Sequence, residues 1–138
     1  MQIFGANIPF AHHCGIEPIE FSDGTARLRM RVRGNLTNNL GVAHGGLICT
    51  LLDIAMGTAA RCTIGAPVLT LDMHTSFLSP GRGELIGEGR VIRAGRSVIF
   101  CEAEVMTLDG NLVARATGIF KPVRKTPSQL GDIGLPLA

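Results

Sequence analysis

The sequence has 138 residues, enough for one domain with a substantial core and too few for two ordinary domains. Hydrophobic residues make up 46% and charged residues 17%, which excludes a disordered, strongly solvated chain. The net charge of +2 comes from scattered residues, which argues against a nucleic-acid partner and leaves anionic small molecules open. No CxxC spacing is present, so we expect reduced cysteines without disulfides or a zinc site: Cys14, Cys49, Cys62 and Cys101.

The start of the chain predicts short elements in a soluble, cytoplasmic protein. A turn or short helix is expected from Pro9 to Cys14, then a strand from Glu17 to Phe21 with a hairpin turn at Asp23-Gly24. His12-His13-Cys14 has no matching metal-ligand spacing nearby, so it favours a loop at a pocket rim over a metal site. The N-terminus lacks a basic segment followed by a long apolar one, and no apolar run approaches membrane-spanning length.

The next two segments predict a strand and then a helix. Residues 25–33 alternate strictly, with apolar side chains on one face and four arginines on the other, which indicates a strand with one solvated face. Residues 45–60 contain no proline and are longer than a typical strand. On a helix they would form one apolar ridge from Leu47, Leu51, Ala55 and Ala59. This segment should be a largely buried helix.

Four further strands are expected after the helix, over residues 68–78, 84–93, 97–108 and 112–120. Turn-forming residues separate them at Ser79-Pro80-Gly81, Ala94-Gly95-Arg96 and Asp109-Gly110. Because these links are short, the four strands should pair in chain order as an antiparallel meander, with the helix covering one face. Residues 123–138 are rich in proline and polar residues and are expected to form a surface tail.

Asp53 is the only charged side chain between His44 and Arg61, in the middle of the most apolar segment. A buried carboxylate needs hydrogen bonds, a partner charge or a raised pKa, and enzymes use such sites for an acid, a base or a nucleophile. A structural ion pair or a polar edge that faces water would explain the same position. Periodicity alone leaves both interpretations open.

The start of the predicted helix, His44-Gly45-Gly46, has no Ser or Thr cap and should expose backbone N–H groups. Such groups attract anions, and if they pointed at a thioester carbonyl they would form an oxyanion hole. Two glycines also suit close packing alone. Asp53 lies eight residues beyond Gly45, about two helical turns. A site completed across a subunit interface would bring both groups to one carbonyl.

The run Asn38-Asn39-Leu40-Gly41-Val42-Ala43-His44-Gly45-Gly46, followed by Asp53, resembles the signature of hotdog-fold thioesterases of the phenylacetate-pathway (PaaI-like) type. The order of the predicted elements also resembles this α+β fold, in which an antiparallel sheet wraps around one long helix. The resemblance covers about residues 8–122 and implies one hotdog domain over residues 1–138. It implies an acyl-CoA thioesterase for small aromatic or medium-chain acyl groups, a dimer or tetramer without a metal or redox cofactor.

The resemblance also implies roles for single residues. Gly45 would donate its N–H to the thioester oxygen, and Asp53 of the facing subunit would act as nucleophile or as general base on water. Asn38 would position the thioester or the water, and His44 would orient the site through hydrogen bonds. Thr70 lies near the place where some relatives carry a water-holding serine. Simple strand alternation puts it on one face with Asp72, His74 and Ser76.

Basic residues and free N–H groups are expected to bind the CoA phosphates at the rim of the pocket. The candidates are Arg96 and Ser97 in the turn at Gly95, with Gly46, Arg82 and Arg93 in addition. Ordinary surface arginines explain the same pattern equally well. The arginines of residues 25–33 are interpreted as the solvated face of a strand.

Two other functions stay open beside the thioesterase. One is a hotdog hydratase or dehydratase acting on acyl thioesters, since a fold alone does not determine chemistry; the histidine-containing motif typical of those relatives is absent. The other is a non-catalytic module that binds acyl-CoA.

Overall fold

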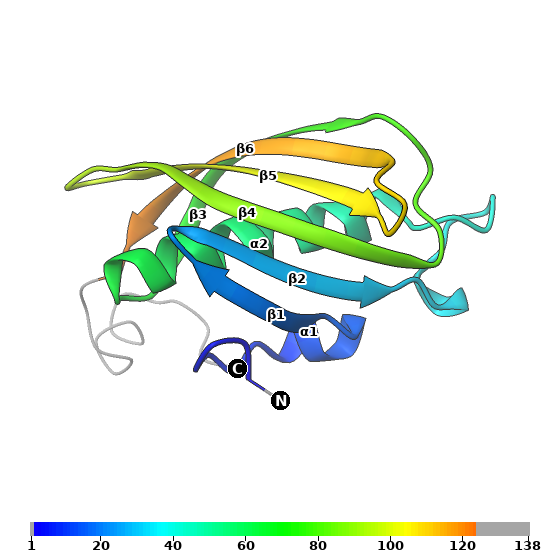
Figure 1. The fold of residues 1–138 in the computed structure, drawn as a ribbon, viewed down its shortest axis with the longest axis horizontal. Helices are drawn as coiled ribbons and strands as arrows, with labels where there is room; N and C mark the ends of the chain where they lie inside the picture. The colour runs from blue at the N-terminus through cyan, green and yellow to red at the C-terminus, as the bar shows by residue number, and fades with distance from the viewer. Residues whose placement is uncertain (1, 124–138) are drawn as a thin grey trace.

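A six-stranded antiparallel sheet wraps around one long helix in the computed structural model, which describes residues 2–123 (Figure 1). In chain order the elements are α1 (Pro9–Cys14), β1 (Glu17–Ser22), β2 (Thr25–Arg31), the 3-10 helix η1 (Gly34–Leu36), α2 (Gly45–Ile64), β3 (Val68–Phe77), β4 (Glu84–Ala94), β5 (Ile99–Thr107) and β6 (Leu112–Pro122). The predicted α+β class and hotdog architecture are confirmed. Apart from Val123, the predicted tail lies outside the described residues.

The ends of the elements follow local sequence signals. Asp23 and Gly24 have φ values of 50° and 73°, the left-handed pair that a two-residue hairpin turn requires between β1 and β2. Helix α2 continues one turn beyond the predicted end and stops at Gly65, which has a φ of 70°. The Gly65 N–H donates to the Arg61 carbonyl, so a glycine satisfies the last turn of the helix.

The order of the strands in the sheet is β1-β2-β4-β5-β6-β3, so the predicted four-strand meander is wrong for β3. Strands β4, β5 and β6 pair in chain order, but β3 lies at the far edge beside β6. Three strand spacings amount to about 14 Å, and the six residues 78–83 can reach about 20 Å when extended. The link therefore crosses the ends of β5 and β6, and it is held there where Leu78 and Ser79 donate to the Val113 carbonyl.

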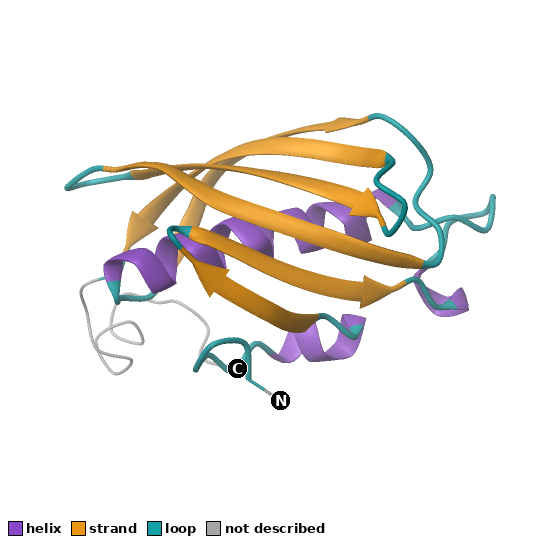
Figure 2. Ribbon diagram, in the orientation of Figure 1, coloured by secondary structure: helices purple, strands orange, loops and turns teal. Residues whose placement is uncertain are grey.

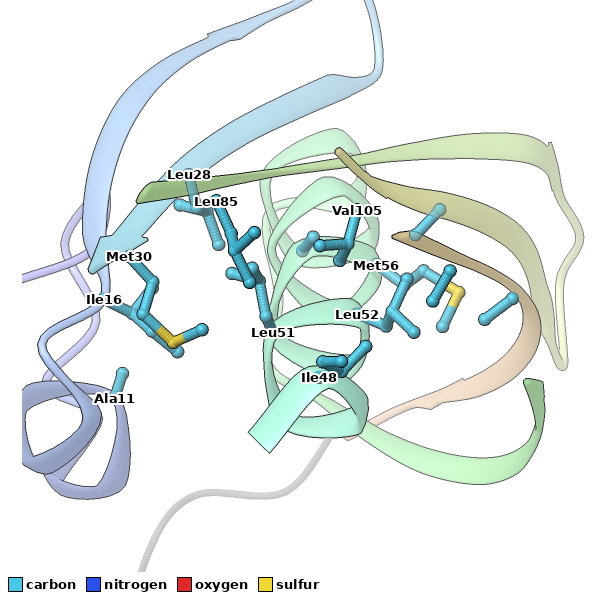
Figure 3. Packing of buried hydrophobic residues seen from close by; sticks show 14 of the residues in the cluster. Ala11, Ile16, Leu28, Met30, Ile48, Leu51, Leu52, Met56, Leu85 and Val105 are labelled. Carbon is cyan, nitrogen blue, oxygen red and sulfur yellow. The ribbon is translucent and has the colours of Figure 1, made fainter. Parts of the chain in front are cut away.

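Helix α2 packs into the concave side of the sheet. Figure 3 shows Leu51, Leu52 and Met56 of α2 pointing into a core that also contains Leu28 and Val105, and all five side chains are fully buried. The closest approach is at Gly89 of β4, where an added Cβ would lie 2.4 Å from the Ala55 carbonyl carbon and oxygen. Only glycine permits the helix backbone to come this close to the sheet.

Among the described residues, α2 is the one helix long and apolar enough to cross a membrane, judged by length and composition. This corrects the statement that no apolar run approaches that length. Half of the residues in that window are buried inside the structure, and Figure 3 shows core side chains packed along the helix. Its position is that of a core helix.

Candidate active site

The loop before α2 is shaped by Asn38. Its side-chain Oδ1 accepts hydrogen bonds from the N–H groups of Leu40 (2.9 Å) and Val42 (3.3 Å), and Gly41 takes the left-handed conformation, with a φ of 76°. The loop is then tied to the rest of the fold, because Ala43 donates to the Gly81 carbonyl at 2.9 Å. In this structure Asn38 orders the turn that leads into the helix. Its predicted contact with substrate or water stays a prediction.

His44 caps the start of α2. Its Nδ1 accepts a hydrogen bond from the Gly46 N–H at 2.8 Å, which corrects the expectation that no side chain would shield the helix start. The His44 carbonyl accepts from Leu47 and Ile48 at 2.9 and 3.2 Å. Within residues 2–123, the Gly45 N–H has no hydrogen-bond acceptor. Of the two glycines, Gly45 therefore presents the unsatisfied donor, while the N–H of Gly46 is already bonded.

Asp53 is paired with Thr70 of β3. The Thr70 hydroxyl donates to Asp53 Oδ1 at 2.7 Å, and the carboxylate is half-buried on the side of α2 that faces β3. The structure thus brings together two of the predicted site residues that lie 17 positions apart in the sequence. One carboxylate oxygen is fixed by this bond, which orients the other.

A β-bulge decides which face of β3 carries Thr70. The pairing with β6 shifts between Thr70 and Asp72, so Thr70 lies opposite the buried Phe120 and Asp72 opposite Ile119. Thr70 therefore faces α2, whereas Asp72 faces away from it together with His74 and Ser76. The expectation that all four share one face is wrong, because the extra residue Leu71 reverses the alternation.

Two further contacts between α2 and β3 lie closer to the start of the helix than the Asp53–Thr70 pair. Cys49 Sγ lies 4.0 Å from the Thr75 hydroxyl, and an added Cβ on Gly45 would meet the Phe77 ring at 3.6 Å. The seam, defined by these contacts and the Asp53–Thr70 pair, thus has Gly45 at one end. The sequence pattern missed Phe77, which is 54% exposed, because alternation cannot show which apolar residues of an edge strand stay uncovered.

Eight residues of helix separate Gly45 from Asp53, which corresponds to about 12 Å along the axis. One carbonyl carbon cannot lie within bonding reach of an oxygen at Asp53 while its oxygen accepts from Gly45 of the same chain. Gly45 and Asp53 both lie on the side of α2 that faces β3, where Asp53 contacts Thr70 and an added Cβ on Gly45 would meet Phe77.

The predicted CoA-binding residues fall at two ends of β4. Arg82 directly follows Gly81, whose carbonyl is bonded to the loop before α2, so it lies at the Gly45 end. Arg93, Arg96 and Ser97 lie at the opposite end of this 11-residue strand, about 33 Å away. Figure 2 shows the loops of residues 37–44 and 78–83 gathered where α2 begins, and the β4–β5 turn at the far end. One protomer does not bring these candidates together.

Arg27 and Arg29 of β2 form ion pairs on the outer face of the sheet. Arg27 lies 3.1 Å from Glu88 and Arg29 lies 3.5 Å from Glu17. These pairs are largely exposed, so each contributes little to stability. The interpretation of this stripe as a solvated strand face fits their geometry.

Cysteine chemistry does not offer a competing nucleophile in the buried core. Burial raises the pKa of the Cys101 thiol to about 12, and burial also raises the pKa of Cys14, partly offset by the positive charge of Arg33. A thiol with a raised pKa stays protonated near neutral pH and is a poor nucleophile. All four cysteines are free.

Comparisons with known proteins agree on one family. The profile of the thioesterase superfamily matches residues 40–114, which include the end of the loop before α2, the whole helix, β3, β4, β5 and the start of β6. A candidate esterase of Halobacterium salinarum is 39% identical over 67% of this chain and 66% of its own length, just under two thirds. Acyl-coenzyme A thioesterase 13 of Homo sapiens is 31% identical over 70% of this chain and 72% of its own.

A solved structure shows the same architecture. It is a candidate thioesterase, a phenylacetic acid degradation-related protein, from Ralstonia eutropha. It superposes with a TM-score of 0.78 at 30% identity, covering 84% of this chain and 92% of that protein.

Proposed function

Because the chain belongs to the thioesterase superfamily, whose members hydrolyse thioesters, we propose that it hydrolyses an acyl-CoA to a free acid and CoA. The profile match and the solved structure confirm the predicted family, the hotdog-type thioesterases. One observation supports this site: the Gly45 N–H, which has no acceptor among residues 2–123, lies on the same side of α2 as the Asp53 carboxylate, which accepts from the Thr70 hydroxyl. Acyl transfer needs a donor for the developing oxyanion and a group that delivers a nucleophile.

In the proposed reaction the thioester oxygen accepts a hydrogen bond from Gly45, which stabilises the negative charge of the tetrahedral intermediate. Asp53 either removes a proton from water, whose oxygen then bonds to the carbonyl carbon, or attacks that carbon itself and is released by water. The C–S bond breaks in either route, and the CoA sulfur leaves and takes up a proton. Thr70 keeps the Asp53 carboxylate oriented through its hydroxyl.

We propose that two copies complete the site, as the separation of Gly45 and Asp53 along α2 requires. The sheet ends in two edge strands, β1 and β3. β1 has six residues that include Pro18 and the charges of Glu17 and Glu20, features that discourage pairing with another strand. β3 has ten residues, and Leu69 and Leu71 are 47% and 55% exposed. A long edge strand with exposed leucines favours pairing with a second copy.

The substrate part of the proposal rests on relatives and charge. The name of the human relative, acyl-coenzyme A thioesterase 13, supports an acyl-CoA substrate. The CoA phosphates would bind Arg82 at the Gly45 end, with Gly46 beside the carbonyl; Arg93, Arg96 and Ser97 would take part from a neighbouring copy. CoA enters as part of the substrate, and no metal or redox cofactor takes part. We place this reaction in the cytoplasm, and a small aromatic or medium-chain acyl group is the proposed acid.

The substitution Asp53→Asn tests the proposal. Hydrolysis of a panel of aromatic and straight-chain acyl-CoAs should fall at least about a hundredfold, because the carboxylate acts in the chemical step, while binding of acyl-CoA is retained. Asp72→Asn is the matched control, since Asp72 is exposed on the other face of β3, and it should keep wild-type rates.

Three results would each contradict a part of this proposal. Undiminished hydrolysis by the Asp53→Asn variant would remove Asp53 from the mechanism. Binding of acyl-CoA by the wild type without any release of free CoA would favour the non-catalytic module. Hydration of an enoyl-CoA with the thioester intact would favour the hydratase.

A further inference from the structure

Gly45, Cys49 and Asp53 lie on one face of α2. They are spaced four residues apart, just over one turn of an α-helix, so successive positions are offset by only about 40° around the axis. All three are half-buried, whereas the leucine and isoleucine residues that flank Cys49 on both sides of this face belong to the core. This half-covered face is a part of α2 that a second copy can still approach.

The contacts with β3 put Cys49 between the other two residues in space as well as in sequence. Asp53 accepts from Thr70 at one end of the seam between α2 and β3. At the other end, an added Cβ on the glycine would meet the Phe77 ring. Cys49 Sγ lies 4.0 Å from the Thr75 hydroxyl oxygen, between these ends. Cys49 is therefore at the middle of the stretch of α2 that carries both halves of the proposed site.

Two copies that share their reaction centres must meet symmetrically. Most homodimers have a two-fold axis, so each contact between two different residues occurs twice. When Gly45 of one copy lies opposite Asp53 of the other, Asp53 of the first lies opposite Gly45 of the second. The two α2 helices are then antiparallel along this stretch. Cys49, midway between the two ends, lies opposite Cys49 of the second copy.

The dimensions of packed helices allow the two thiols to meet. Packed helices have axes about 8–10 Å apart, and their Cα atoms lie about 2.3 Å from each axis. Facing Cα atoms at the crossing point are then about 3 to 5 Å apart, which overlaps the separation of about 4 to 7 Å between the Cα atoms of a disulfide. Crossing helices diverge on both sides of this point, which leaves room for a carbonyl group at Gly45 and Asp53.

We propose that two copies pair through α2 about a two-fold axis that passes beside Cys49, so that the two Cys49 thiols face each other between the two reaction centres. This inference rests on the shared thioesterase site proposed above. The partner is a second copy of this chain, because a second α2 supplies Asp53 opposite Gly45 in the required register. Cys49 is thus an interface residue, separate from the groups that act on the carbonyl.

Cross-linking with diamide tests the axis in the full, unaltered chain, whose cysteines are free. Two thiols lose two protons and two electrons and form one S–S bond, and diamide takes up both to become a hydrazine. The wild type should give a covalent dimer on a non-reducing gel. Cys49→Ser should abolish this dimer, whereas Cys62→Ser, the control on the same helix, should retain it. Asp53→Asn should cross-link like the wild type, because the carboxylate takes no part in thiol oxidation.

A charge swap shows whether residue 49 meets itself. Cys49→Lys and Cys49→Glu should each give a monomer without hydrolysis of acyl-CoA, because like charges then oppose each other across the axis. A mixture of the two variants should regain the dimeric mass in light scattering and the hydrolysis, because opposite charges then meet. Thr63→Lys and Thr63→Glu are the matched controls, since Thr63 is exposed on α2 beyond the shared stretch, and each should keep wild-type mass and activity.

The outcomes separate the axis from the function on which it rests. A covalent dimer that persists in Cys49→Ser, or no covalent dimer in the wild type, overturns the position of the axis, while hydrolysis by the wild type still stands. A mixture of folded charge variants that stays monomeric also overturns it; if either variant fails to fold, the cross-link alone decides. Cross-linking through Cys49 in a wild type that hydrolyses no acyl-CoA supports the axis and contradicts the thioesterase.

Discussion

Asp53 and Thr70 show what a single hydrogen bond contributes to a site. The carboxylate lies on an apolar helix, and its oxygen accepts from a hydroxyl at 2.7 Å. Hydrogen bonds to charged groups are stronger than neutral ones and also restrict geometry. The Thr70 hydroxyl therefore supplies the hydrogen bond that a half-buried carboxylate requires, and no cation takes part in the pair. The second carboxylate oxygen is left available for water or substrate.

We predict that Thr70→Val lowers kcat roughly tenfold with KM within about twofold, because the lost bond is one to a charged group. Thr70→Ser keeps the hydroxyl and should retain most of the activity. Steady-state kinetics of both variants on one acyl-CoA check this. Equal activity in the Val and Ser variants would mean that the hydroxyl does not position Asp53 during the reaction.

At the scale of elements, the contact between α2 and β4 sets how deeply the helix sits in the sheet. Gly87 and Gly89 of β4 face the helix, and an added Cβ at Gly87 would lie 2.7 Å from the Leu51 side chain. At Gly89 the obstacle is the helix backbone itself. A flexible side chain can move aside, but a helix backbone cannot move without disturbing its neighbours.

Gly89→Ala should therefore lower the free energy of unfolding by about 3 kcal/mol, at the upper end of overpacking costs. The matched control is Gly34→Ala, because an added Cβ there meets nothing within 4 Å and the backbone is not left-handed. That variant should stay within about 0.5 kcal/mol of the wild type. Urea unfolding measures the stability of both variants, provided that the dependence of the unfolding free energy on urea concentration has the same slope as in the wild type. Similar unfolding midpoints for the two variants would contradict the close approach of α2 to β4.

At the scale of the whole molecule, the two edges of the sheet differ. β1 is short, charged and interrupted by Pro18, whereas β3 is longer and exposes Leu69 and Leu71. The proposed site needs Gly45 of one copy opposite Asp53 of another. The quaternary structure and the activity should therefore change together.

We predict that the double substitution Leu69→Lys with Leu71→Lys gives a monomer that no longer hydrolyses acyl-CoA, although Asp53 and Thr70 are intact. Charges on an edge strand block its pairing with another strand. Ile19→Lys on β1, the opposite edge, is the control and should leave both mass and activity unchanged. Light scattering gives the mass and a CoA-release assay the activity; an active monomer would show that one chain suffices.

The sequence alone determined the features that depend on neighbouring residues. Alternation predicted β2, the apolar ridge predicted α2, and Asp23-Gly24 predicted a hairpin turn that the φ values confirm. The spacing from Asn38 to Asp53 indicated the family that the profile match confirms. These signals are local, because helical periodicity, strand alternation and turn conformation are set by adjacent backbone dihedrals.

Only the tertiary structure decided the features that depend on distant contacts. β3 pairs with β6 instead of β4. The length of the link of residues 78–83 permits either pairing, so the sequence did not decide between them. The bulge at Leu71 turned Thr70 toward Asp53, and the placement of α1 put Phe10 beside the start of α2. Strand pairing and helix docking are chosen by hydrogen bonds and buried area between segments far apart in the chain, and no local pattern carries that information.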